Sequence, residues 1–597
     1  MRRPISLRLF RLRFWRKLRR SQRQFENLSQ EAEQNLEKLF FKRFGRLKPV
    51  RRFVISWVAL IALLIAAVMV QNLLLSGYFQ TLQPVAGGIY NEGVLGNFRG
   101  ANPLYATSDI DVSVSRLVFS GLFTHNDQNQ FVGDLASSYS VDARGLIYTV
   151  HLKPHLSWHD GQPLTSADVA FTYNVIENPD ASSPLRSSWQ GITVTAPDAR
   201  TVTFKLPSPL ASFAYNLTNG IVPQHVLKDI PLANLRSADF NTVHPIGSGP
   251  FMWQGIDVTG TDPSNAEEQI SLLPFTNYSG GQPKLQEFIV HAYADEQKLI
   301  KAFRGGQLAG IEGLSSIPKN LTKQQGVYTH NLLFSAGVYV FFKTSVGVLA
   351  DQKVRQSLVQ AANAPDIISH LGYATPAVRE PVLKSQFAYN PAYAQASFSL
   401  SSADSILSGD GWLMDKDGYR HRDKATLSFS LTAPDTGEYK QVTERLRQQW
   451  QKLGVRVDVR LQNNDDFHNS LTYHDYDAVL YGVSLGLDPD VFVYWHSSQA
   501  DIRSANRLNL SEYKNAAADA ALEAGRTRLD PTLRSVKYRP FLQAWQQDAP
   551  ALGLYQPRLL YLTNGSVAGL NDHVINAATD RYSNVQNWQI REARVTN

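Results

Sequence analysis

The strongest indication of a catalytic site is the sequence Gly482-Val483-Ser484-Leu485-Gly486, late in the chain. A serine between two glycines at the end of a strand is the arrangement of a hydrolase nucleophile, and Asp530 and His573 follow it in the order that such a triad requires. Pro489 argues against this chemistry, because it falls where the helix after the nucleophile should be running. The chain also lacks a His-Gly-Gly sequence for an oxyanion site. Serine hydrolysis at Ser484 is therefore only a third hypothesis.

Metal chemistry has a weaker basis. His151, His155 and His159 recur every four residues, but their surroundings read as a strand and a turn, so the three side chains do not share a helix face. The chain has no cysteine, which excludes disulfides, thiolate metal sites, a cysteine nucleophile and a lipid-modified cysteine anchor. The sequence predicts no catalytic residue, no cofactor and no metal site.

The 23 residues from Phe53 to Leu75 carry no charge. As a helix they would reach roughly 34 Å, enough to cross a hydrocarbon core of about 30 Å. The 52 residues before them hold 17 Lys or Arg and four Asp or Glu, whereas the rest of the chain holds 42 bases and 48 acids. Positive residues beside a span stay cytoplasmic. The sequence predicts a basic cytoplasmic tail at 1–52, a transmembrane helix at 53–75, a linker at 76–86 and an extracytoplasmic body.

The basic tail suggests a partner. Between Arg2 and Arg23, bases interleave with leucine and aromatic side chains, a pattern suited to anionic lipid head groups. Nucleic-acid binding and a purely topogenic signal are the alternatives, and we predict lipid contact and no nucleic acid. A cleaved signal peptide is disfavoured because 52 residues precede the apolar run.

The body begins with short strands. Residues 146–152 and 201–206 read as strands bounded by turn residues. Between them Thr165 and Asp168 have the spacing of a capping box, which predicts a helix that starts there.

Longer helices follow. A strand at 426–433, a helix at 438–453 and a strand at 455–461 predict a βαβ crossover and hence a parallel or mixed sheet, with Gly454 in the left-handed position after the helix. Another helix is predicted to begin at Asp530-Pro531. Its expected buried residues are Val536, Phe541, Leu542 and Trp545.

Several motifs of the body stand in the order found in one known family. They are Gly87-Gly88-Ile89-Tyr90-Asn91-Glu92-Gly93, Asn102-Pro103-Leu104, Asp134-Leu135-Ala136, the run from Trp158 to Thr172, Gly247-Ser248-Gly249-Pro250-Phe251, and the run from Tyr476 to Asp490. In these motifs the chain resembles the family 5 extracellular solute-binding proteins of ABC importers, the oligopeptide-, dipeptide- and nickel-binding group. The resemblance runs from about Gly87 to the C-terminus.

The resemblance implies an α/β fold of two lobes, like that of periplasmic binding proteins, with an extra inserted domain and one preceding transmembrane helix. Lobe I is expected from 87–121, 244–335 and 555–597, the inserted β-rich domain from 122–243, and lobe II from 336–554. The hinge is expected to be two crossing strands, within Phe334–Lys343 and Gly553–Leu562. Closure about it would seal a ligand from water.

The expected ligand-binding residues are Tyr481, Gly482, Val483, Leu485, Tyr555, Trp253 and Trp495. By the resemblance, Tyr481 to Val483 would offer backbone groups to an extended ligand, and Tyr555 a hydrogen bond. In peptide-binding relatives, the residue three positions before an Asp-Pro pair is an aspartate that pairs with the peptide's amino terminus. This chain has Leu485 at that position. Leucine cannot offset the burial of an ammonium, so free-amine peptides in that pose are disfavoured. N-blocked peptides, other polar oligomers and a peptide held elsewhere stay open, as does plain packing of these residues in an interlobe wall.

The sequence as a whole predicts a membrane-anchored, extracytoplasmic solute-binding component of a bacterial ABC importer. It would capture a peptide-like or other oligomeric solute by interlobe closure and deliver it to the permease subunits, without catalysing a reaction. The alternative is a membrane-tethered ligand sensor or adhesion module that uses the same binding fold.

Overall fold

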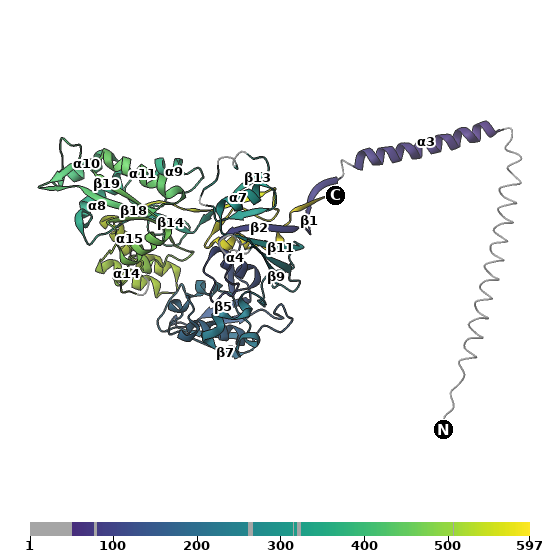
Figure 1. Ribbon diagram of the computed structural model, residues 1–597, viewed down its shortest axis with the longest axis horizontal. Coiled ribbons are helices and arrows are strands. Elements are labelled where there is room, and N and C mark those ends of the chain that lie inside the picture. Colours follow the sequence, from purple (N-terminus) through teal and green to yellow (C-terminus); the bar gives the residue numbers. More distant parts are fainter. Residues whose placement is uncertain are drawn as a thin grey trace, which may run out of the picture. The chain divides into compact units, whose positions relative to one another are not determined.

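The computed structural model describes residues 50–76, 80–260, 267–314, 316–318, 321, 324–504 and 507–596. The chain divides into an N-terminal unit, Met1–Gln83 with Glu592–Asn597, and a body, Pro84–Arg591. Figure 1 gives the element labels used below. The predicted lipid-binding stretch from Arg2 to Arg23 lies outside the described residues, so the lipid contact stays a prediction.

The N-terminal unit contains one long helix, α3 (Arg51–Ser76), whose bounds enclose the predicted span. Residues Arg51–Asn72 are long and apolar enough to cross a membrane, and none of this stretch is buried against protein. An apolar helix that no protein core covers differs from the core helix of a soluble domain, whose apolar face is buried. Outside the helix, β1 (Gln80–Val85) pairs with β24 (Arg591–Thr596) in a two-stranded sheet.

The first lobe of the body is built on an eight-stranded mixed sheet in the order β23-β13-β22-β12-β2-β11-β10-β9. At its centre β2 runs parallel to both of its neighbours, β11 and β12. The strands are β2 (Ile89–Leu95), β9 (Phe251–Thr259), β10 (Glu267–Pro274), β11 (Glu287–Tyr293), β12 (Gly310–Glu312), β13 (Val327–Phe334), β22 (Arg558–Asn564) and β23 (Val574–Ile575). The helices are α4 (Asp109–Val118), α7 (Glu296–Arg304), η11 (Ala578–Tyr582) and η12 (Val585–Asn587).

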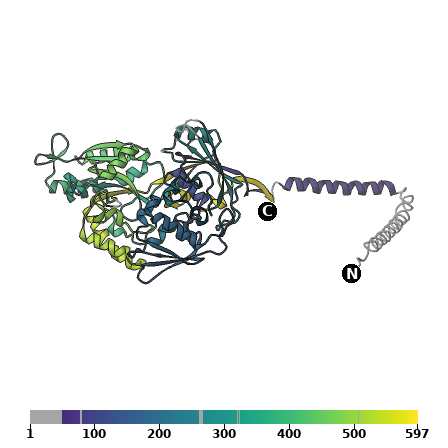
Figure 2. The ribbon, with the colours of Figure 1, turned by 60° about the horizontal axis from the view of Figure 1, so that its bottom comes forward.

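Between α4 and β9 the chain forms an inserted β-rich segment, which comes forward in Figure 2. Its antiparallel sheet has the order β5-β6-β8-β7, and the capping box of Thr165 and Asp168 starts α5 as predicted. A continuous hydrophobic core joins this segment to the first lobe. The elements are β3 (Phe123–His125), β4 (Phe131–Gly133), β5 (Ala136–Val141), β6 (Ile147–Leu152), β7 (Thr193–Asp198), β8 (Thr201–Lys205), α5 (Ser166–Glu177), α6 (Gln224–Leu227), η3 (Pro179–Ala181), η4 (Arg186–Ser188), η5 (Phe213–Thr218), η6 (Leu232–Ser237) and η7 (Asp239–Asn241).

The second lobe is built on a five-stranded sheet in the order β19-β18-β20-β14-β21. Its strands are β14 (Ala336–Phe342), β18 (Ser428–Pro434), β19 (Arg456–Gln462), β20 (Ala478–Ser484) and β21 (Ala551–Tyr555). The predicted βαβ crossover is confirmed, because β18 and β19 are parallel and α11 (Gly437–Lys452) joins them. Gly454 follows that helix with a φ of +83°, the left-handed conformation that its position predicted.

Helices cover both faces of this second sheet, as Figure 1 shows. One face is covered by α8 (Gln352–Ala361), α9 (Ala364–Ser369), α10 (Leu400–Gly409) and α11, and the other by α14 (Ala516–Arg526) and α15 (Pro531–Asp548). The remaining elements are α12 (Asn464–Tyr473), α13 (Phe492–Trp495), η8 (Gly347–Ala350), η9 (Pro391–Tyr393), η10 (Ser497–Gln499) and the small sheet β15 (Leu413–Met414), β16 (Arg420–Arg422) and β17 (Ala425–Thr426).

Helix α15 begins at Pro531 behind an Asp530 cap, as predicted, but the prediction that it buries Val536 is wrong. The buried stripe of α15 runs through Tyr538, Phe541, Leu542 and Trp545 at helical spacing. Val536 lies two residues from Tyr538, about 200° around the helix, and its side chain is 45% exposed.

Two connections join the lobes, and they lie side by side. The chain passes from β13 to β14 through Ser335, and from β21 to β22 through Gln556 and Pro557. The backbone N–H of Phe334 donates to the carbonyl of Pro557 at 2.9 Å, and the Gln556 side chain donates to the carbonyl of Phe334 at 3.1 Å. Both connections fall within the segments expected for the hinge. Tyr555, expected at the start of a lobe I segment, pairs with Val338 in the second sheet instead.

Candidate functional site

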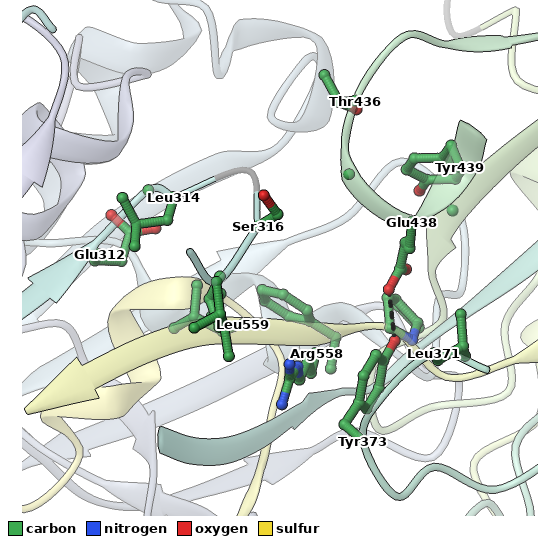
Figure 3. A pocket seen from close by; sticks show the side chains of 18 of the residues that line it. Glu312, Leu314, Ser316, Leu371, Tyr373, Thr436, Glu438, Tyr439, Arg558 and Leu559 are labelled. Carbon is green, nitrogen blue, oxygen red and sulfur yellow. Dashed lines mark hydrogen bonds between the residues drawn. The ribbon is translucent and has the colours of Figure 1, made fainter. Parts of the chain in front are cut away.

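A cavity of about 950 Å³ lies between the lobes, over the two connections. The first lobe contributes Glu312 to Leu314, and the connecting strands contribute Phe334, Ala336 and 557–560. The second lobe contributes 371–373, 436–439 and 481–484. Figure 3 shows Glu312 and Leu314 on one side and Glu438 and Tyr439 on the other, with Leu559 between.

On the second-lobe wall, Glu438 stands in the first turn of α11. Its Oε1 accepts a hydrogen bond from the Tyr555 hydroxyl at 2.9 Å, and its Oε2 accepts one from the Tyr373 hydroxyl at 2.9 Å (Figure 3). Burial raises the pKa of Glu438, and the two tyrosine hydrogen bonds act in the opposite direction. Each carboxylate oxygen thus has a donor from the protein itself.

Arg558, the first residue of β22, also lines the cavity. The carbon at the centre of its guanidinium lies 4.2 Å from the centre of the Tyr373 ring, a cation–π contact. Burial lowers the pKa of Arg558, while Tyr373 and Glu438 act in the opposite direction. The Arg558 cation therefore attracts the Glu438 carboxylate and favours its ionised form.

On the first-lobe wall, Glu312 is the last residue of the short strand β12, which lies between β2 and β22. Its side chain is buried, and its Oε2 has no hydrogen-bond partner among the described residues. Burial raises the pKa of Glu312 to about 7, against the attraction of Arg581. The turn after Glu312 needs a glycine, because Gly313 has a φ of +95° and a Cβ there would lie 2.7 Å from the Leu95 Cβ.

Three of the predicted ligand residues, Tyr481, Gly482 and Val483, line the cavity together. They lie on β20, which pairs with β14 along its whole length. Its other neighbour, β18, pairs with it only at Ala478 and Val479. Among the described residues, the stretch of β20 that lines the cavity therefore has one strand partner, and no strand covers its other edge.

The other four predicted ligand residues do not line the cavity. Leu485 is buried, and its backbone N–H donates to the carbonyl of Ser335. Tyr555 lies behind the wall as a donor to Glu438. Trp253 stacks on Phe98 in the first lobe, and Trp495 stacks on Phe341 in the core of the second. As ligand contacts these four stay predictions, and core packing accounts for Trp495.

The hydrolase residues have separate structural roles. Ser484 lines the cavity, but Asp530 accepts the backbone N–H of Leu533 as the cap of α15, and His573 hydrogen-bonds the carbonyl of Asn571 at 2.7 Å. The three spaced histidines also differ in their surroundings, since His159 bonds the backbone of Gly247 and Gly249 while His151 and His155 are exposed.

Four residues of the site were not predicted from the sequence: Glu312, Tyr373, Glu438 and Arg558. Glu438 has the ordinary position of an acid in a helix's first turn, which conceals any other role. The position of Arg558 just after the Pro557 connection is the one signal that could have singled out a residue of this group.

Comparisons with known proteins agree with this geometry. Residues 130–504 match the family described as bacterial extracellular solute-binding proteins, family 5 middle. The oligopeptide-binding protein AppA of Bacillus subtilis is 25% identical over 516 residues, 85% of this chain and 92% of that protein.

Solved structures share the fold. That of AppA from B. subtilis in complex with a nonapeptide has a TM-score of 0.65 at 24% identity and covers 85% of this chain and 100% of that one. That of NikZ from Campylobacter jejuni in complex with Ni(L-His) has a TM-score of 0.69 at 22% identity and covers 84% of this chain and 99% of that one. A two-lobe α/β body with a cavity over the strands that connect its lobes, and a family match over more than half of the chain, identify it as a member of the family 5 bacterial extracellular solute-binding proteins.

Proposed function

We propose that this protein is the membrane-anchored solute-binding component of an ABC importer and captures a peptide-like or other oligomeric solute between its lobes. The observation that carries the proposal is the cavity of about 950 Å³, lined from both lobes and floored by the strands that connect them. Only two connections of one or two residues join the lobes, so a hinge rotation there would close the cavity over a solute. The size suits a short oligomer, at the upper end of ligand pockets of roughly 300–1,000 Å³.

The cavity wall favours an extended solute. The uncovered edge of β20 at Tyr481 to Val483 would pair with the backbone of a peptide-like ligand, as strands add to an exposed sheet edge. Such pairing uses main-chain groups and therefore tolerates many side chains. The name of the B. subtilis relative, an oligopeptide-binding protein, supports the same class of solute.

The proposed membrane anchor of the binding body is helix α3. The helix is uncharged from Phe53 to Leu75 and follows 17 basic residues, which would keep the N-terminus cytoplasmic and the body outside. An anchored binding protein stays beside its permease. Alkaline carbonate extraction of cell membranes tests the anchor: the full chain is expected in the pellet, and its release into the supernatant would contradict an uncleaved span.

Native mass spectrometry of the full-length protein in detergent tests solute capture. Wild type, purified from cells grown in peptide-rich medium, is expected to carry non-covalent adducts of a few hundred daltons that denaturation releases. Ser484→Trp should reduce the adducts, because the exposed Ser484 side chain lines the cavity and an indole there would occupy space beside β20 that the solute needs.

Ser484→Ala is the matched control, and it also tests hydrolysis. It should retain the adducts of wild type, and neither protein should turn over activated esters. Adducts that persist undiminished in Ser484→Trp would place the ligand outside the cavity, and ester turnover that Ser484→Ala removes would favour the hydrolase.

A further inference from the structure

The two cavity carboxylates differ in whether the protein satisfies them. Glu438 accepts two tyrosine hydroxyls, whereas the Glu312 Oε2 has no hydrogen-bond partner among the described residues, although only 3% of that residue is exposed. A buried carboxylate oxygen without a donor is costly, and a bound solute that supplies the donor would explain why it is retained. Glu312 is thus the unsatisfied acceptor of the cavity.

The cation that acts on Glu312 does not satisfy its Oε2. The Arg581 guanidinium attracts Glu312, but it donates to Glu92, to the Ser113 hydroxyl, to the Ala578 carbonyl and to the Tyr582 hydroxyl. Asp109 and Glu92 add negative charge near Glu312, which opposes the effect of Arg581 and makes the ionised form of Glu312 less favourable. A cation that donated directly to the Oε2 would therefore stabilise the ionised carboxylate.

The two carboxylates also differ in the cations near them. Arg558 lies against Tyr373 and attracts Glu438, and both residues line the cavity with Glu312. The carboxylate oxygen left without a donor is thus the Glu312 Oε2 on the first-lobe wall, where Figure 3 shows Glu312 beside Leu314.

We propose that Glu312 binds a primary ammonium group of the captured solute, so that the first lobe holds the charged end while β20 of the second lobe holds the backbone. The inference rests on the proposed function. It assigns the ammonium to a residue of lobe I, at a place distant in sequence from Leu485. Ammonium binding would also lower the pKa of Glu312, because a nearby cation favours the charged carboxylate.

A matched pair of libraries tests the proposal. The probe is a synthetic tetrapeptide library without arginine and histidine, together with the same library acetylated at every amine. Full-length wild type in detergent, stripped of endogenous solute, is incubated with both at pH 8, and the retained peptides are quantified by mass spectrometry. Free-amine members should be retained at least about tenfold over acetylated ones, the least that a charge-assisted hydrogen bond provides.

Glu312→Gln, which keeps the shape and removes the charge, should lose at least most of that tenfold preference. The matched control is Glu380→Gln: Glu380 is also buried, and burial raises its pKa to about 7, but it does not line the cavity. That control should keep the preference of wild type.

Equal retention of both libraries by wild type, or a preference that survives in Glu312→Gln, would overturn the role of Glu312 and leave solute capture standing. If wild type retains neither library, the peptide-like solute itself is wrong, and the Glu312 proposal falls with it.

Discussion

The two walls of the interlobe cavity each present a carboxylate, and the protein treats the two in opposite ways. On the second-lobe wall, Tyr555 and Tyr373 donate to Glu438, and Arg558 attracts it. On the first-lobe wall, Glu312 is buried with an Oε2 that has no partner among the described residues. A carboxylate that has its own donors is part of the structure, and one without donors depends on what enters the cavity. The contrast suggests a structural role for Glu438 and a recognition role for Glu312.

The largest expected effect on stability comes from removing a hydrogen bond to Glu438 on the second-lobe wall. Tyr555→Phe removes a fully buried donor from Glu438 and leaves one carboxylate oxygen without it. Since hydrogen bonds to charged groups contribute about 1.5–3 kcal/mol, we expect the second lobe to lose about 2–3 kcal/mol of stability. Hydrogen exchange of β14 and β21, compared with that of β2, measures the loss. An unchanged exchange rate in β14 would show that Glu438 does not depend on Tyr555.

Removing the charge of Glu312 on the first-lobe wall is expected to stabilise the protein. Burial raises the folded-state pKa of Glu312 from an ordinary 4.5 to about 7, opposed by Arg581 and reinforced by Asp109 and Glu92. The folded protein thus holds a proton that the unfolded chain releases near pH 4.5, so stability falls as pH rises from about 4.5 to about 7. Glu312→Gln cannot lose that proton. The ligand-free variant should be more stable than wild type by about 2 kcal/mol at pH 8.

Thermal unfolding of both proteins at pH 5 and pH 8 checks this prediction. At pH 5 Glu312 keeps its proton in the folded protein and the unfolded chain has lost it only in part, so the difference from Glu312→Gln should fall to well under half of its value at pH 8. A variant less stable than wild type at pH 8 would mean that the ionised carboxylate already has a partner in the protein.

The smallest effect is expected for Tyr373→Phe. Tyr373 is half-buried, and its ring, which the variant keeps, also contacts Arg558. Water can replace the lost hydroxyl, so we expect the free energy of unfolding to fall by about 1 kcal/mol, less than in Tyr555→Phe. Hydrogen exchange of α11, which carries Glu438, measures it. A loss larger than that of Tyr555→Phe would reverse the order that burial predicts.

Elements set by local sequence were predictable. The strand, helix and strand at 428–462 follow from alternating and helical periodicity, and the capping box at Thr165 from four consecutive residues. Val536 was misjudged because it is apolar but lies off the buried stripe, which depends on which face of α15 meets α14 and the sheet. The bounds of the lobes and the hinge came from the family resemblance and not from periodicity.

The site was predictable only where one segment builds it. Tyr481, Gly482 and Val483 are consecutive, so one motif sufficed to identify them. The pairing of Glu438 with Tyr555 joins residues 117 positions apart, and the burial of Glu312 depends on β2 and β22, both distant in the sequence. A single acid in a three-residue strand has no pattern that distinguishes it from an exposed one.

A structure of the full-length protein with a retained free-amine tetrapeptide would show whether the cavity closes on a solute whose ammonium lies at Glu312. We expect the ammonium nitrogen about 2.7–3.2 Å from a Glu312 carboxylate oxygen, with the peptide backbone along β20. An ammonium that faces Glu438 or solvent, with Glu312 still unpaired, would contradict this expectation.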